Sequence, residues 1–169
     1  MIAQPARLLW ALVAIVPMTL GAGCSSSPAV TQQPGTSKPT VHAGSRQASA
    51  AERAVSIALE QVGVPYRYGG SSPAGFDCSG LVQYSYGRAG VSVPRTTGQL
   101  WSAAATVRGD EMQVGDLLFF SIEGKMSHVG MYVGAGRFVH APQSGRTVSV
   151  ASLEAPFYKS ALLRAGRIY

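Results

Sequence analysis

The sequence predicts an α+β fold, with helices in the first half of the folded part and an antiparallel sheet in the second. Apolar residues recur at helical spacing between residues 51 and 62 and again after Cys78. After residue 116 the pattern changes to five short strand-like runs that follow one another closely. Helices followed by closely spaced strands are typical of an α+β domain. A hydrophobic content of 46% can supply its core, while 20 glycines and 10 prolines indicate many turns.

Residues 1–23 resemble a bacterial lipoprotein signal rather than part of the fold. Arg7 supplies a positive start, and the apolar run of residues 8–20 is too short to span a bilayer comfortably. Small residues then lead to Cys24, which in lipoproteins becomes the lipid-carrying N-terminus. Because Leu20 stands four residues before Cys24 rather than three, cleavage by an ordinary signal peptidase is the alternative. Both interpretations predict an exported protein, and with the lipid we expect it at the periplasmic face of the outer membrane.

Residues 24–49 predict a flexible linker, because they are rich in Ser, Thr, Pro, Gln and Gly and have few large apolar side chains. His42 lies in this linker and has no predicted role. The formal net charge of the whole chain is +6. The arginines are scattered singly and form no run of the kind that binds nucleic acid, so the charge instead favours attraction to anionic material at the cell envelope.

The folded part is expected to be one domain that covers residues 50–169. Its first helix covers residues 51–62 and ends before Gly63 and Pro65. Residues 108–116 form a loop that leads to the strands. The predicted strands are residues 117–121, 127–133, 137–141, 147–150 and 162–168.

Two further helices are predicted between the first helix and the strands. Residues 66–75 contain several glycines and a proline, which excludes a regular helix. Asp77 comes next and is a natural N-cap for a helix that begins at Cys78. A short capped helix is expected to begin near Thr96 or Thr97.

Cys78 is a candidate nucleophile because of its predicted place at a helix N-terminus. Unpaired backbone N–H groups and the helix dipole stabilise negative charge there, so the thiolate, which is the nucleophilic form, should be easier to make. The residues alone leave two alternatives open. Cys78 is an inert buried side chain, or it forms a disulfide with Cys24.

His128 and His140 are the two histidines outside the linker, and both lie in predicted strands. They are candidates for a nucleophilic chain in which Cys78 attacks, His128 takes its proton and His140 orients the His128 ring. The alternative is that both are ordinary histidines of a sheet. A zinc site is a third use, but the spacing lacks the paired pattern of zinc ligands, so we expect no metal.

The turn between the two histidine strands decides whether the histidines share a face of the sheet. A two-residue turn at residues 135–136 would set Met131 opposite His140 and place His128 on the other face, because side chains alternate along a strand.

A three-residue connection at residues 134–136 is the form we predict. It sets Gly130 opposite His140 and brings His128 onto the same face, where Gly130 leaves room for the two rings. Gly136 suits the left-handed position that this connection needs. The other face then receives an apolar set suited to a core, namely Val129, Met131, Val133 and Val139.

Six motifs resemble, in their order and approximate spacing, those of the NlpC-type cell-wall cysteine endopeptidases. They are Tyr66-Arg67-Tyr68-Gly69-Gly70, Phe76-Asp77-Cys78-Ser79-Gly80-Leu81-Val82, Pro94-Arg95-Thr96, Val114-Gly115-Asp116-Leu117, Ser127-His128-Val129-Gly130-Met131-Tyr132 and Phe138-Val139-His140-Ala141. The resemblance covers about residues 50–169. It implies a papain-like α+β fold and hydrolysis, without a cofactor, of amide bonds in the stem or cross-link peptides of bacterial peptidoglycan.

The resemblance also implies roles for single residues. By position, Cys78 is similar to the nucleophile, His128 to the general base and His140 to the orienting residue. Tyr66 resembles the tyrosine whose hydroxyl holds the oxyanion beside the Cys78 backbone N–H, and its alternative is a packing aromatic.

Three more residues are expected near the substrate. Asp77 and Ser79 are similar to residues that contact the substrate peptide, and Asp77 is the helix cap in either case. Arg95 is expected either to meet a substrate carboxylate or to brace a loop.

These features together predict an exported, lipid-anchored peptidoglycan endopeptidase that acts as a monomer and binds no nucleic acid. Two alternatives stay open: a non-catalytic wall-binding or scaffold lipoprotein that uses the same groove, and an amidase or acyltransferase on the same fold. The choice between the D-Glu–diaminopimelate and D-Ala–diaminopimelate bonds depends on the shape of the groove.

Overall fold

The computed structural model describes residues 48–168. The predicted signal at residues 1–23, the lipidation site Cys24 and the linker through residue 47, with His42, lie outside the described residues. Within the described part, no helix combines the length and the apolar character needed to cross a membrane.

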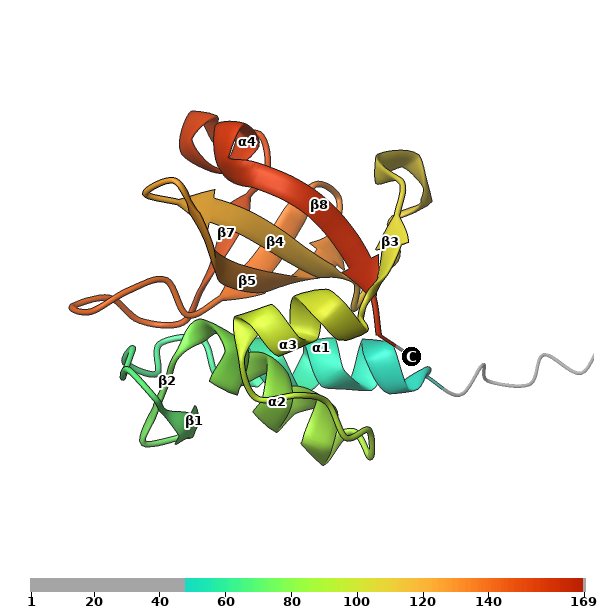
Figure 1. The fold of residues 1–169 in the computed structure, drawn as a ribbon. Helices are drawn as coiled ribbons and strands as arrows, with labels where there is room; N and C mark the ends of the chain where they lie inside the picture. The colour runs from blue at the N-terminus through green and yellow to red at the C-terminus, as the bar shows by residue number, and fades with distance from the viewer. Residues whose placement is uncertain (1–47, 169) are drawn as a thin grey trace, which may run out of the picture. The chain divides into compact units, whose positions relative to one another are not determined.

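The described part has two layers (Figure 1). One layer consists of three helices, and the other is a six-stranded antiparallel sheet. Helices α1 (Ala50–Glu60), α2 (Cys78–Arg88) and α3 (Thr97–Ala103) lie along one face of the sheet. The strand order across the sheet is β3 (Ala105–Val107), β8 (Leu162–Arg167), β4 (Leu117–Ile122), β5 (Lys125–Gly134), β6 (Arg137–His140) and β7 (Ser149–Ser152). A short helix, α4 (Pro156–Ala161), lies on the other side. The predicted α+β fold is confirmed.

All three predicted helices and all five predicted strands are present, with ends shifted by a few residues. Thr96 is the N-cap of α3 and exchanges hydrogen bonds with Gln99, in agreement with the predicted capped helix. Four features were missed: the hairpin of β1 (Ser71–Ser72) and β2 (Gly75–Phe76), strand β3, the 3-10 turn η1 (Gly109–Glu111) and helix α4. Each of these elements covers six residues or fewer, too short for a clear periodicity.

The β5–β6 turn differs from the predicted three-residue connection. Gly134 pairs with Arg137, so the turn has two residues, Ala135 and Gly136. Both have positive φ, 51° and 66°, as a type I′ turn requires. Such a turn twists in the same sense as the strands that it joins, which explains why the shorter connection is formed.

A bulge at Val133 nevertheless restores the predicted register. The pairing shifts by one residue next to Val133, and beyond this point Met131 pairs with Val139. This is the offset that puts His128 and His140 on one face of the sheet. The extra residue sits in the strand rather than in the turn.

The space above Gly130 is also used differently from the prediction. A Cβ atom on Gly130 would lie 2.5 Å from Cδ2 of Phe138. The missing side chain therefore makes room for the Phe138 ring, which in turn packs with its centroid 4.8 Å from that of His140.

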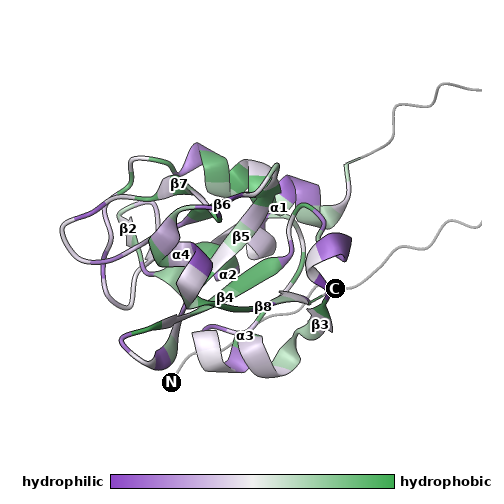
Figure 2. Cartoon of the chain, turned by 90° about the horizontal axis from the view of Figure 1, so that it is seen from above, coloured by the Kyte–Doolittle hydropathy of each residue, from purple (hydrophilic) through white to green (hydrophobic). Residues whose placement is uncertain are grey.

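The sheet separates two apolar clusters. Alternate residues of β4 point to opposite faces: Leu117 and Phe119 join the larger cluster under the helices, while Leu118 and Phe120 join the smaller cluster beside α4. In Figure 2, β4 is coloured as hydrophobic along much of its length. The predicted apolar set enters the larger cluster, with Val129, Met131 and Val139 fully buried and Val133 packed at its edge.

Asp116 is a fully buried carboxylate that joins the start of β4 to the end of β8. Arg167 Nε donates to Oδ1 at 2.7 Å and Nη2 donates to Oδ2 at 2.8 Å. The backbone N–H of Gln113 adds a third bond, to Oδ2, at 2.8 Å. Burial with several donors makes this pair hard to break without loss of stability.

We expect Asp116→Asn to lower the free energy of unfolding by about 3 kcal/mol, because it leaves the Arg167 guanidinium without its carboxylate in a partly buried place. Urea denaturation measures the change. Asp110→Asn is the matched control, since Asp110 pairs with Arg108 at the surface, with side chains 68% and 75% exposed. That control should change stability by less than about 0.5 kcal/mol. Equal losses in the two variants would contradict the prediction.

Candidate active site

Helix α2 begins where the sequence predicts, with Asp77 as the N-cap and Cys78 as the first helical residue. Oδ1 of Asp77 accepts the backbone N–H of Gly80 at 2.6 Å. The cap satisfies one of the free donors of the first turn and leaves Cys78 at the positive end of the helix.

The same carboxylate holds the surrounding segments together. Arg95 donates to both Asp77 oxygens, at 2.9 Å and 2.7 Å, and the backbone N–H of Gly69 donates to Oδ2 at 3.0 Å. Burial on its own would raise the pKa of Asp77, but the hydrogen bonds from Arg95, Gly80 and Ser79 outweigh it and hold the pKa below its ordinary value. Asp77 is therefore an ionised link between the loop, the helix and the segment before α3.

Arg95 braces this loop, which is one of its two predicted roles. Its Nη1 donates to Oγ of Ser79 at 3.0 Å, and its Nη2 donates to the carbonyl of Gly70 at 3.4 Å. The side chains of Asp77, Ser79 and Arg95 are thus engaged with one another. Their predicted contact with substrate stays a prediction.

Gly80 permits the close approach of α2 to the loop. A Cβ atom there would overlap the carbonyl oxygen of Gly70, which accepts the backbone N–H of Asp77 at 3.0 Å. The glycine after Asp77-Cys78-Ser79 is therefore required by packing.

Cys78 carries a free thiol between the helices and the sheet. Its Sγ lies 3.6 Å from Oγ1 of Thr97, on α3, and 3.9 Å from the carbonyl oxygen of Ser127, on β5. Ser127 directly precedes His128, so the candidate nucleophile lies beside the strand of the candidate base.

Burial raises the pKa of the Cys78 thiol. Hydrogen bonds from Thr97 and from the backbone N–H groups of Val129 and Ser79 lower it, but burial has the largest effect. The expected ease of thiolate formation at the helix N-terminus is therefore outweighed. At neutral pH the resting group is the thiol, and attack needs a base.

His128 on β5 and His140 on β6 form a buried pair. Nε2 of His128 lies 2.8 Å from Nδ1 of His140, and the rings stand nearly perpendicular, at 78°. Burial lowers the pKa of His128 to about 4. Burial and the neighbouring His128 lower that of His140 to about 3. Both imidazoles are therefore neutral at neutral pH.

The bond between the rings determines which nitrogen is available to Cys78. Nε2 of His128 is taken by His140, which leaves Nδ1 for the thiol proton. For Nδ1 of His128 to accept the thiol proton, Nε2 must carry the proton of the neutral ring and donate a hydrogen bond to Nδ1 of His140, and we assign this tautomer. His140 then carries its proton on Nε2, which lies 3.4 Å from the Tyr158 hydroxyl.

Within residues 48–168, Sγ of Cys78 and the His128 ring make no direct hydrogen bond. Contacts between nucleophile and base are often long in an empty site and tighten when substrate binds.

Tyr66 lies in the loop that precedes β1, next to the main core. Burial raises the pKa of its hydroxyl, and Cys78, once ionised, and the charged Asp77 raise it further. The phenol is thus protonated, a donor, and near enough to Cys78 to interact electrostatically. These properties fit the predicted oxyanion role, which stays a prediction beside the packing alternative.

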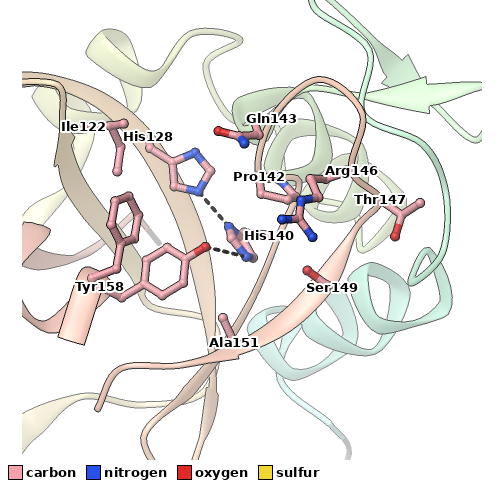
Figure 3. A pocket seen from close by; sticks show the side chains of 11 residues that line it. Ile122, His128, His140, Pro142, Gln143, Arg146, Thr147, Ser149, Ala151 and Tyr158 are labelled. Carbon is pink, nitrogen blue, oxygen red and sulfur yellow. Dashed lines mark hydrogen bonds between the residues drawn. The ribbon is translucent and has the colours of Figure 1, made fainter. Parts of the chain in front are cut away.

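A cavity of about 560 Å³ adjoins the histidine pair (Figure 3). Its walls come from the end of β4, from β5, β6, β7 and α4, and from the loop between β6 and β7. The lining residues are Ile122, His128, His140, Pro142, Gln143, Arg146, Thr147, Ser149, Ala151, Phe157 and Tyr158.

Several residues of this region were missed from the sequence. Tyr158 belongs to the unpredicted helix α4, and Thr97 was predicted only as part of a helix start. Arg146 stands in a loop outside all six motifs. Nothing in their local sequence distinguishes them, because their proximity to the histidines arises from the fold. As for metals, no three His, Cys, Asp or Glu side chains of the described part come close enough together to hold an ion.

Residues 63–167 match the NlpC/P60 family. The chain is 40% identical over 116 residues to murein DD-endopeptidase MepH of Escherichia coli K12, covering 65% of this chain and 43% of that protein. It is 37% identical over 128 residues to gamma-D-glutamyl-L-lysine dipeptidyl-peptidase of Bacillus subtilis 168, covering 74% and 43%. The chain thus spans less than half the length of these two relatives.

Solved structures of the same family superpose on this chain. An NLP/P60 family protein of Staphylococcus aureus Mu50, described as similar to lipoprotein, superposes with a TM-score of 0.64 and 35% identity, covering 70% of this chain and 41% of that one. The NlpC/p60 domain of the peptidoglycan hydrolase SagA superposes with a TM-score of 0.61 and 34% identity, covering 69% and 97%.

We expect Gly80→Ala to lower the free energy of unfolding by about 1–3 kcal/mol, because the added methyl forces α2 away from the Gly70 carbonyl. Gly87→Ala is the matched control in the same helix, where a Cβ atom meets nothing within 4 Å. That variant should gain about 0.5–1 kcal/mol, since alanine favours the helix. Thermal unfolding of both variants distinguishes a packing requirement from helix propensity. If the Gly80→Ala protein were as stable as the Gly87→Ala protein, packing would not require a glycine at position 80.

The protein should lose stability as the pH falls from about 6.5 to about 4, because the histidines bind protons more weakly in the folded state than in the unfolded state. The stability is fully present above the ordinary histidine pKa and is lost as the pH falls toward the folded values. The loss should reach several kcal/mol. Urea titrations at pH 7 and pH 4.5 measure it. His140→Gln should show a smaller pH dependence, and an unchanged dependence in this variant would count against the buried pair as its source.

Proposed function

The chain belongs to the NlpC/P60 family, and on that premise we propose that it is a peptidoglycan endopeptidase that hydrolyses amide bonds in murein stem or cross-link peptides. The observation that carries the proposal is the bond between His128 and His140, which leaves Nδ1 of His128 for a thiol at the start of α2. The names of the relatives, a murein endopeptidase and a dipeptidyl-peptidase, support the substrate class.

In the proposed reaction, Sγ of Cys78 attacks the amide carbonyl carbon while the thiol proton passes to Nδ1 of His128. The resulting imidazolium keeps its Nε2–H bond to His140. The oxyanion accepts the backbone N–H of Cys78 and the hydroxyl of Tyr66. His128 then gives the proton to the leaving amine, and a thioester with Cys78 remains.

Water completes the cycle. Neutral His128 takes a proton from the water molecule whose oxygen attacks the thioester carbon. The C–S bond then breaks, His128 returns the proton to the departing Sγ of Cys78, and a carboxylic acid is released. No cofactor takes part. Because both imidazoles are neutral at rest, His128 is in the correct form to act as base at neutral pH.

The predicted placement of the enzyme belongs to the same proposal. We propose that the protein is exported, that Cys24 carries a lipid at the periplasmic face of the outer membrane, and that residues 24–49 tether a monomeric domain at residues 50–169. A similarity to a structure described as lipoprotein-like supports the anchor.

Two alternatives have distinct outcomes. A wall-binding scaffold would bind peptidoglycan and release no peptide. An amidase or acyltransferase on the same fold would form an acyl group on Cys78 from a different substrate, which intact-protein mass spectrometry detects.

The test is digestion of purified peptidoglycan with the full-length protein under reducing conditions, with the released peptides identified by mass. Wild type should release peptides whose masses name the bond that is cut. Cys78→Ala and His128→Ala should each lower the rate by at least about 10³-fold, since the two residues act as a unit. Asp110→Asn, at the surface, is the control and should retain the rate. Equal product from wild type and Cys78→Ala would eliminate the proposed mechanism, and intact wall in both would favour the scaffold.

A further inference from the structure

The cavity beside the histidine pair contains a positive charge that the proposed mechanism does not use. Arg146 is a lining residue, and the described residues that share the cavity with it include no Asp or Glu. We propose that this cavity binds a free carboxylate of the substrate peptide, with Arg146 as its charged partner. This inference rests on the proposed function, because it places in the cavity a part of the peptide that Cys78 attacks.

The Arg146 guanidinium is uncommitted in the described part of the chain. No ion pair or side-chain hydrogen bond involves it there, although its backbone makes two hydrogen bonds. Arg95 and Arg167, by contrast, are each paired with an aspartate in a bidentate manner. Arg146 therefore keeps its planar set of donors for a partner from outside, and that geometry matches a carboxylate.

The backbone holds Arg146 in a fixed place relative to the reaction centre. Its N–H donates to the carbonyl of Gln143 in a turn where Gly145 has a φ of 77°. Its carbonyl accepts the backbone N–H of Tyr66 at 2.8 Å. Val148, two residues on, donates its backbone N–H to the carbonyl of Val64 at 2.8 Å. The loop that carries Arg146 is thus paired directly with the segment that carries the oxyanion candidate.

Neutral donors complete the cavity. Figure 3 shows Arg146 and Tyr158 on either side of His140, with Gln143 and Ser149 nearby on the cavity wall. In the tautomer that the proposed mechanism requires, Nε2–H of His140 donates to the Tyr158 oxygen, which leaves the phenolic O–H to donate elsewhere. The charge of Arg146 also reaches this hydroxyl, since it offsets part of the rise that burial causes in the pKa of Tyr158.

This donor set fits a singly charged ligand. One guanidinium and several neutral donors balance one carboxylate, whereas a doubly charged phosphate would remain undercompensated. The cavity also shares His128 and His140 with the proposed reaction centre, and this shared wall is the reason to place in it a carboxylate of the same peptide that Cys78 attacks.

The test uses one synthetic wall peptide with all carboxyl groups free and a matched series in which each carboxyl is amidated in turn. Binding to the full-length Cys78→Ala protein is measured by calorimetry, so that no turnover occurs. Amidation of one carboxyl should weaken binding about tenfold or more, as expected for loss of a charge-assisted pair.

Variants of the same protein then test whether the loss of affinity on amidation depends on Arg146. Arg146→Gln in the Cys78→Ala background should weaken binding of the free-acid peptide by a similar factor and abolish the difference between the acid and that amide. Arg146→Lys should restore part of the difference. Arg137→Gln removes an equal charge from another exposed arginine, on β6 and outside the cavity, and should leave the difference unchanged.

The outcomes separate this inference from the proposed function. If no amidation changes affinity, if Arg146→Gln preserves the difference, or if no peptide binds, the carboxylate site is overturned. Cleavage by the protein with intact Cys78 is scored separately. Cleavage without an acid preference overturns the site and supports the peptidase, while an Arg146-dependent acid preference without cleavage supports the site and opposes the peptidase.

Discussion

The geometry of the candidate site depends on one buried carboxylate, that of Asp77. It caps α2, which carries Cys78, and it binds the loop that follows Tyr66 through the backbone of Gly69. Through Arg95 it also holds the segment that leads into α3. The candidate nucleophile, the candidate oxyanion donor and the helix that contacts the thiol are therefore positioned by the same group. Buried ion pairs add little net stability over apolar packing, so the main effect of this one is on the relative placement of those parts.

Burial disfavours the charged form of the groups on both sides of the thiol, but hydrogen bonds overcome it on one side only. Asp77 stays charged because donors surround its carboxylate, whereas His128 and His140 stay neutral because the pair is desolvated and has no acidic partner within hydrogen-bonding distance in the described part. Cys78 lies between them with a raised pKa. The resting site thus holds a neutral thiol and a neutral base, and charge separates only when the thiol attacks. The groups that contact the developing oxyanion and imidazolium must therefore stabilise the charges that form during the attack.

The sequence predicted the long elements and the cap, because their signals are local. The helical spacing of residues 51–62, the N-cap Asp77 and the alternation around His128 all follow from nearby residues. The short elements carried too few residues for a pattern, and α4, which brings Tyr158 to His140, was lost with them. Whether a pKa is raised or lowered also depends on burial, which the position of a residue in a helix does not reveal. For this reason the expected lowering of the Cys78 pKa is not found.

Because of the bulge at Val133, the two histidines share a face of the sheet only if the β5–β6 turn and the bulge together contain an odd number of residues. With a two-residue turn and an uninterrupted ladder, His140 and Phe138 would have turned toward the helices and Val139 toward α4, because pairing with β4 fixes the face of His128. One unpaired residue in the strand cancels one residue missing from the turn. In evolution, the two lengths can change only together, as a compensating insertion and deletion on either side of Gly134. A hairpin transplanted from another protein would need to bring its own bulge, or a turn longer by one residue.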